Sequence, residues 1–199
     1  YTEHIDTGET DPVKTLMEWS GGSDSQLIAA VGGAIYDVSD GTIPAISLAT
    51  GYTSDIWSFT NYSTAGGQYL LAANSSGSDT PWVYDGITLS ALVLVGPTIT
   101  NISQVSIYQQ RVFYVEKNTL SVWYTAAGAF QGALTEFDFG PFCTRGGEIA
   151  AITTWTRDNG FGGVDDLFVV ATTKGEVLVY QGPNPSVATT WSMQGRFVV

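Results

Sequence analysis

The chain of 199 residues carries few side chains that could perform covalent catalysis. His4 is the single histidine and Cys143 the single cysteine. A Ser-His-Asp or Cys-His arrangement needs a base that is held rigidly beside its nucleophile, and His4 lies in a terminal segment where we expect no such support. We therefore predict that the protein is not an enzyme and needs no cofactor. Cys143 cannot form a disulfide within the chain, and we expect it to be a buried or half-buried thiol.

The carboxylates around one glycine-rich loop are the best candidates for a metal site. Asp158 lies at the start of this loop, and Asp165 and Asp166 follow it. Oxygen-only ligation by these residues could hold a calcium ion, although their spacing is not that of an EF-hand loop. We favour the simpler interpretation, which is a solvated loop with Asx turns. Histidine and cysteine clusters with zinc-ligand spacing are absent from the sequence.

The charge balance argues against tight binding to nucleic acids. Seven basic residues stand against nineteen acidic ones, which gives a formal net charge of −12. Affinity for nucleic acids comes chiefly from Lys and Arg side chains that displace counterions from the phosphates. The first twelve residues contain no Lys or Arg, and we predict that they form an acidic arm that contacts a partner or DNA. Its four interaction candidates are Glu3, Asp6, Glu9 and Asp11.

No apolar run approaches the roughly 18 residues that a membrane-spanning helix needs, so we predict no membrane contact. The longest such runs, among them residues 91–95, have the length of a strand. With 44% hydrophobic and 13% charged residues, the chain has the composition of a globular protein rather than of a disordered one. We predict one repeat domain over residues 13–199.

A short pattern recurs four times along the chain. An apolar strand is followed by a tight polar or glycine turn and then by a second strand that ends on an aromatic residue. The closing residues, at intervals of 40 to 56 positions, are Tyr36, Tyr84, Tyr124 and Tyr180. A period of this length, built from hairpins, is typical of propeller blades. One hairpin cannot bury its apolar face alone, so neighbouring units must stack.

Each hairpin is preceded by a further strand signal and followed by a more irregular one. The leading strands are expected at residues 15–19, 56–62, 105–108 and 149–155. A leading strand, a hairpin and an outer strand make a four-stranded blade. We therefore predict an all-β fold, a β-propeller-like array of about four antiparallel blades. Because four blades are few for a closed ring, the array is expected to be incomplete or open.

The aromatic residues leave a second function open. The six tryptophans recur in step with the repeat, which favours blade packing over the stacking of sugars. Thr156, Asp158 and Gly160 partly resemble the Asp-box of sialidase propellers, but the aromatic residue expected later in that motif is missing. The alternative function is a carbohydrate-binding or sialidase-like, glycan-processing propeller. A scaffold for cellular protein partners is disfavoured, because no Trp-Asp dipeptide closes the repeats.

Nine phrases, spread in order over almost the whole chain, carry a resemblance to a known family. They are VKTLMEW (13–19), AIYDV (34–38), GGQYL (66–70), RVFYVEKNTL (111–120), VWY (122–124), GG (146–147), TWTRD (154–158), GEVLVYQG (175–182) and NPS (184–186). They resemble a family of bacteriophage and prophage tail proteins that is related to the short-tail nozzle, or tubular, proteins. Members of the family are longer, so the chain resembles an internal fragment of one.

The resemblance implies a structural, non-enzymatic component of a phage tail. Related nozzle proteins are β-propellers arranged as rings around the DNA exit channel. The implied partners are other tail or connector proteins and further copies of the chain, in the virion tail and, during assembly, in the host cytoplasm. The acidic composition agrees with this role, because DNA would pass an acidic channel without being held. The acidic arm would then line the channel or contact another subunit.

Overall fold

The fold was analysed from a computed structural model, which describes residues 5–41, 45–158 and 164–199. The side chains of residues 157, 158, 164 and 165 are not described. The regular structure of the described residues consists of strands and two single-turn 3-10 helices, η1 (Ile99–Asn101) and η2 (Gly140–Phe142). Four four-stranded sheets, each built from a run of neighbouring chain segments, confirm the predicted all-β, propeller-like array.

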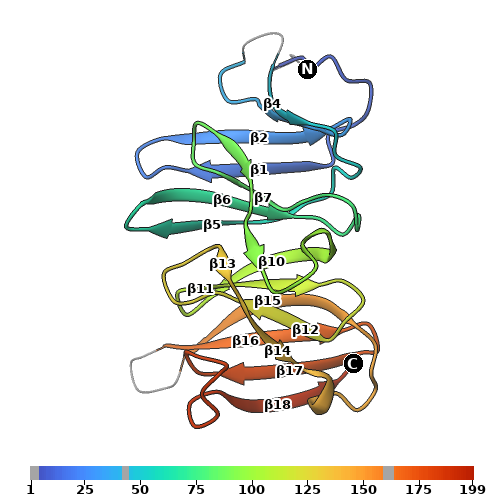
Figure 1. Cartoon of the computed structure of the whole chain (residues 1–199), viewed down its shortest axis with the longest axis vertical. Coiled ribbons are helices and arrows are strands. Elements are labelled where there is room, and N and C mark those ends of the chain that lie inside the picture. The colour runs from blue at the N-terminus through green and yellow to red at the C-terminus, as the bar shows by residue number, and fades with distance from the viewer. Residues whose placement is uncertain (1–4, 42–44, 159–163) are drawn as a thin grey trace. The chain divides into compact units, whose positions relative to one another are not determined.

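In each of these sheets, neighbouring strands are hydrogen-bonded in chain order. Figure 1 shows the strands along the chain. The first sheet contains β1 (Thr15–Ser20), β2 (Ser25–Val31), β3 (Ala34–Asp37) and β4 (Ile46–Thr50), and the second contains β5 (Ser58–Thr64), β6 (Gly67–Ala73), β7 (Trp82–Tyr84) and β8 (Leu89–Ala91). The third contains β10 (Ile102–Tyr108), β11 (Arg111–Glu116), β12 (Ser121–Tyr124) and β14 (Thr135–Asp138). The fourth contains β15 (Ile149–Asp158), β16 (Val164–Thr172), β17 (Glu176–Gln181) and β18 (Ser192–Val198). A short parallel pair is formed by β9 (Leu94–Val95) and β13 (Gly132–Ala133).

The chain divides into two compact units. Unit 1 comprises Tyr1–Leu92 and Ile99–Ser103, and unit 2 comprises Val93–Thr98 and Gln104–Val199. The first two sheets belong to unit 1. The fourth sheet and nearly all of the third belong to unit 2.

In unit 1, the two central strands of the first sheet, β2 and β3, are buried on both faces. Side chains alternate along a strand, so Ile28 and Ala30 of β2 enter a cluster with Trp82 of the second sheet. Ala29 and Val31, on the opposite face, enter a separate cluster. This two-sided burial explains why β2 is a continuous apolar run rather than an alternating one. The turn to β3 uses Gly32 and Gly33, both with positive φ, as a tight two-residue hairpin requires.

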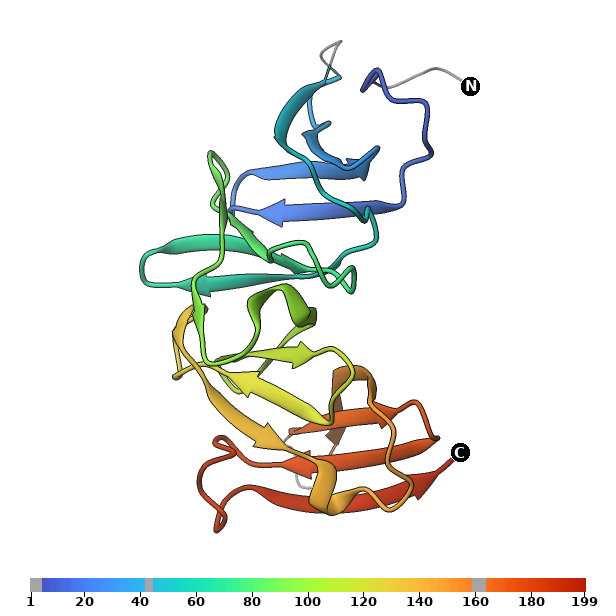
Figure 2. The same ribbon diagram turned by 45° about the vertical axis from the view of Figure 1, so that its right-hand side comes forward.

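In unit 2, one aromatic cluster joins the third and fourth sheets. Phe168 of β16 is fully buried, and its ring centroid lies 4.6 Å from that of Phe113 and 5.5 Å from that of Tyr108. Phe139, which follows β14, is also fully buried in this cluster. The η2 turn, drawn in gold at the end of β14, lies beside the red strands of the fourth sheet (Figure 2). The cluster therefore brings a connecting segment together with a blade.

Candidate functional site

The described part of the acidic arm is attached to the first sheet of its own unit. Ile5 packs against the cluster of that sheet that contains Ala29 and Val31. The carbonyl of Asp6 accepts a hydrogen bond from the N–H of Ala45 at 3.0 Å. Glu9 Oε1 accepts a hydrogen bond from the Tyr36 hydroxyl at 2.8 Å. Burial and then this carboxylate raise the pKa of Tyr36. Asp11 is exposed, and Glu3 lies outside the described residues.

The predicted calcium ligands are not brought together by any described contact. Asp166 is exposed, and its Oδ1 accepts a hydrogen bond from the Thr156 hydroxyl at 2.8 Å. Asp158 lies in β15 and Asp165 in β16, but their side chains and the intervening loop lie outside the described part of the structure. Among the described residues, no group of three or more His, Cys, Asp or Glu side chains could hold a metal ion. The calcium site thus stays a prediction.

Two buried carboxylates, which the sequence analysis did not single out, hold connecting segments. Glu176 accepts hydrogen bonds from the Thr144 hydroxyl at 2.6 Å, the Thr144 N–H at 3.0 Å and the Arg145 N–H at 2.7 Å. In unit 1, Asp79 accepts hydrogen bonds from the N–H groups of Thr53 and Ser54. Glu176 and Asp79 are each less than 7% exposed. Their role is structural, because saturated carboxylates have little capacity left for a ligand.

Acid is expected to weaken unit 2 through Glu176. The Thr144 hydroxyl, followed by the Arg145 N–H, lowers the pKa of Glu176 below its ordinary value of 4.5. Because the folded pKa is depressed, this stabilisation is present above the unfolded pKa and is lost as the pH falls through the folded pKa. Thr144→Val removes the largest cause, so the decline in unfolding free energy below about pH 5 should become shallower than in the wild type.

Urea denaturation at several pH values checks this expectation. Thr153→Val is the matched control, because its side chain is exposed and does not contact Glu176. The control curve should run parallel to that of the wild type. Equal slopes for Thr144→Val and Thr153→Val would show that Glu176 does not contribute to acid sensitivity.

The tryptophans divide into packing residues and one exposed residue. Trp57, Trp82 and Trp191 are at most 5% exposed, which confirms the packing interpretation for them. Trp19 and Trp123 are half-buried, and their indole N–H groups donate to Gln68 and Glu116. Trp155, by contrast, is 57% exposed. The sequence repeat did not predict this difference in exposure, because the exposure of Trp155 depends on which face of the fourth sheet is covered.

The outer face of the fourth sheet is apolar and partly uncovered. Ile152, Phe168 and Leu178 point into the aromatic cluster, so the alternate residues of these strands lie on the other face. These outer-face residues are Ala151, Thr153, Trp155, Leu167, Val169, Ala171, Val177, Val179, Gly195 and Phe197. None of these described side chains is charged, although the paired positions Arg157 and Asp165, at one end of β15 and β16, have the same register parity. Phe197 is 56% exposed. We call this set the outer face of the fourth sheet.

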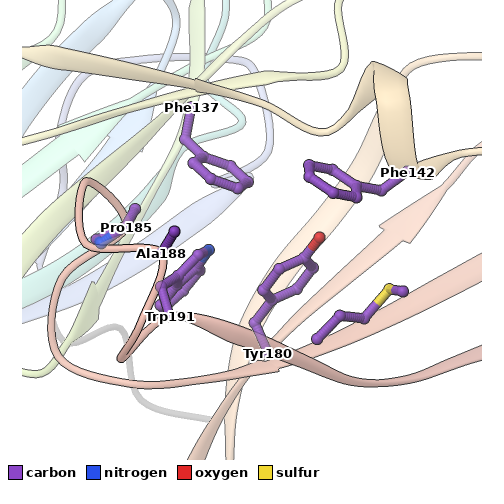
Figure 3. A pocket seen from close by; sticks show the side chains of 7 residues that line it. Phe137, Phe142, Tyr180, Pro185, Ala188 and Trp191 are labelled. Carbon is purple, nitrogen blue, oxygen red and sulfur yellow. The ribbon is translucent and has the colours of Figure 1, made fainter.

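An aromatic pocket of about 250 Å³ lies elsewhere in unit 2. Its wall residues come from β14, η2, the end of β17, the 183–191 segment and β18. They are Phe137, Phe142, Tyr180, Pro185, Ala188, Trp191 and Met193 (Figure 3). The rings of Tyr180 and Trp191 stack, with centroids 5.1 Å apart and an interplanar angle of 20°. Burial, followed by Cys143, raises the pKa of Tyr180 to about 12. Its hydroxyl therefore remains a proton donor at neutral pH.

Comparison with known proteins shows the fold alone. No family model and no curated protein matches the chain. The chain is similar to BBS1N, a β-propeller, in its complex with ARL6DN. For the mercury-soaked crystal the TM-score is 0.53 at 12% identity, covering 94% of this chain and 55% of that one, and the lead-soaked crystal gives the same TM-score. The chain thus spans about half the length of BBS1N. It is also similar to the computationally designed Ika4 protein, with a TM-score of 0.53 at 17% identity, covering 91% of this chain and 98% of that one.

Proposed function

We propose that the chain is a structural, non-enzymatic component of a bacteriophage or prophage tail. It would contribute to a ring-shaped nozzle or connector around the DNA exit channel, in which copies of the chain contact one another and other tail proteins. The resemblance of the nine sequence phrases suggests the phage setting. The observation that carries the structural role is the pair of exposed aromatic residues, Trp155 and Phe197, on the outer face of the fourth sheet.

Two exposed aromatic residues, on the edge strands of one sheet face, are unusual for a surface that stays in water. Contiguous exposed apolar patches mark interaction sites, and aromatic residues are enriched at the centres of interfaces. A chain with a net charge of −12 repels its own copies. Contact between copies is therefore least opposed where a face carries few charges, and on the outer face of the fourth sheet the charged positions are Arg157 and Asp165, of opposite sign, at one end of β15 and β16.

A second copy of the chain is the proposed occupant of this face. In unit 1, the cluster of the first sheet that contains Ala29 and Val31 is already covered by Ile5 and Ala45 from the same chain. The fourth sheet has no comparable cover over Trp155 and Phe197 in the described part of the chain. A ring of copies requires contact between two different surfaces of the subunit, so this face would supply one of them.

A charge placed on the outer face should prevent association. We expect Trp155→Lys to weaken self-association at least tenfold, because it removes apolar contact area and buries an unpaired ammonium group. Ile87→Lys is the matched control, since Ile87 is 85% exposed in unit 1, and it should associate like the wild type. Sedimentation velocity over a range of concentrations measures the effect. A wild type that stays monomeric at about 100 μM, well above typical interface affinities, would contradict the proposal.

The phage setting needs a separate experiment. Electron microscopy of intact particles that encode the parent protein should locate this chain in the tail ring. Density for the chain elsewhere in the particle, or in no particle at all, would remove this part of the proposal. Self-association could still hold in that case, so the two tests fail independently.

The glycan alternative has less support. Trp82, a candidate for sugar stacking, is fully buried between packed side chains, and none of the residues that line the aromatic pocket is charged. A sialidase-like site requires carboxylates or arginines that converge on its substrate. A glycan array would nevertheless be informative, because binding that depends on the half-buried Trp123 would favour this alternative.

A further inference from the structure

The aromatic pocket is separate from the outer face of the fourth sheet. Tyr180 pairs with Met193 across β17 and β18, whereas the neighbouring pair, Val179 and Gly195, lies on the outer face. Side chains alternate along these strands, so the pocket opens on the inner side of the sheet. Whatever binds in the pocket therefore does not depend on the contact proposed between copies.

The walls of the pocket are rings set edge to face around the stacked pair. Phe137 and Phe142 each approach Tyr180 at 5.9–6.0 Å with interplanar angles of 76–78°. Phe137 meets Trp191 in the same way, at 5.9 Å and 76°. Edge-to-face contacts of this kind fix ring orientation. The aromatic walls of the pocket are thus held in fixed orientations.

Two hydrogen-bond donors at this pocket have no acceptor. The Tyr180 hydroxyl and the Trp191 indole N–H are buried and unpaired among the described residues. Figure 3 shows both polar atoms at the ends of their rings that face the space bordered by Phe137 and Phe142. Trp57 and Trp82 also carry unpaired indole nitrogens, but they pack inside the first unit's core cluster. Leaving a buried donor unpaired is costly, so two of them at one pocket need an explanation.

We propose that this pocket binds a small neutral molecule, about the size of one ring, that carries an acceptor oxygen such as a ketone or amide carbonyl. The lining contains no charged side chain, which excludes a preference for ions. A volume of about 250 Å³ is below the range of drug-sized ligand sites and suits a single ring with a short substituent. Both unpaired groups are donors, so the ligand must supply the acceptor.

The entrance has one wall that can move. Met193 is 43% exposed, and its unbranched thioether side chain adapts easily to a neighbouring group. Ala188, on the 183–191 segment, is exposed and small. The two donors are closed off from solvent, so a ring reaches them only when a lining side chain moves, and Met193 is the most adaptable of the exposed lining side chains.

Two probes of matched shape test the proposal. Acetophenone carries a carbonyl, and ethylbenzene has nearly the same shape without it. Titration of the ¹⁵N-labelled full chain should show acetophenone binding at least tenfold more tightly than ethylbenzene, since only the carbonyl oxygen can accept hydrogen bonds from the two donors. The indole N–H signal of Trp191 should move downfield with acetophenone alone.

Three variants separate this pocket from other aromatic surfaces. Tyr180→Phe keeps the ring, so it should leave ethylbenzene binding unchanged and reduce the preference for acetophenone to less than about threefold. Without ligand, the same variant should melt at a higher temperature than the wild type, because an unpaired buried hydroxyl is removed. Ala188→Trp should block both probes, whereas Ala127→Trp, at an exposed position outside the lining, should block neither.

Equal affinity for the two probes would overturn the proposal, and so would a Tyr180→Phe variant that keeps the full preference or is less stable than the wild type. Binding that survives in Ala188→Trp would likewise overturn it, because the probes would then occupy another surface. Ligand binding at this pocket does not depend on the phage assignment, so failure here leaves the proposed function untouched.

Discussion

Phe168→Ala is expected to lower the free energy of unfolding of unit 2 by about 3–5 kcal/mol, the range for large-to-small substitutions at fully buried aromatic positions. The Phe168 ring contacts four other aromatic rings, which belong to Tyr108, Phe113, Phe139 and Trp191. Because these neighbours come from two strands of the third sheet and from the segments after β14 and before β18, they cannot collapse together into the space left by the ring. Urea denaturation followed by near-ultraviolet circular dichroism measures the loss.

Phe197→Ala is the matched control, since this ring is in the same sheet but 56% exposed. Its cost is expected to stay below about 1 kcal/mol, as for most surface substitutions. If the two variants were equally destabilised, the aromatic cluster would not be the main source of stability in unit 2. The same outcome would weaken the assignment of Phe197 to an uncovered face.

Gly182→Ala is expected to have the second largest effect, a loss of about 3 kcal/mol or more, because backbone strain and a steric clash act together. Gly182 has a φ of +128°, and a Cβ at this position would lie 1.8 Å from the carbonyl oxygen of Thr190. Backbone atoms cannot rotate away as a side chain can. The 183–191 segment must move instead, and with it Trp191 of the aromatic pocket. The Trp191 indole signal should therefore shift or broaden in the folded variant.

Gly128→Ala distinguishes the clash from the dihedral angle. Gly128 also has a positive φ, of +78°, but a Cβ there would meet no atom within 4 Å. Its expected cost is about 1–2 kcal/mol, which is the strain of a left-handed L residue alone. Comparable losses in the two variants, measured by thermal denaturation, would mean that the close approach of Thr190 does not constrain the segment.

The sequence alone predicted the strands whose burial is two-sided. The second strands of the repeats, such as β6 and β11, are continuous apolar runs because their central residues are buried on both faces. The positions of the closing tyrosines could also be predicted from the sequence, because each lies at or next to the end of the second strand of its hairpin. The boundaries were less accurate: β15 extends from Ile149 to Asp158, beyond the predicted end at residue 155. An exposed strand end has no apolar pattern to mark it.

The candidate sites required the tertiary structure. The sequence placed Tyr180 at the end of a hairpin, but its unpaired hydroxyl follows from the rings of Phe142 and Trp191, which lie in other segments. Glu176 follows a Lys-Gly turn and has the pattern of an exposed residue, yet it is buried by hydrogen bonds from Thr144 and Arg145. Local periodicity records only which faces are apolar. Which distant groups meet, and which face of the last sheet stays open around Trp155, is decided by the packing of segments far apart in the chain.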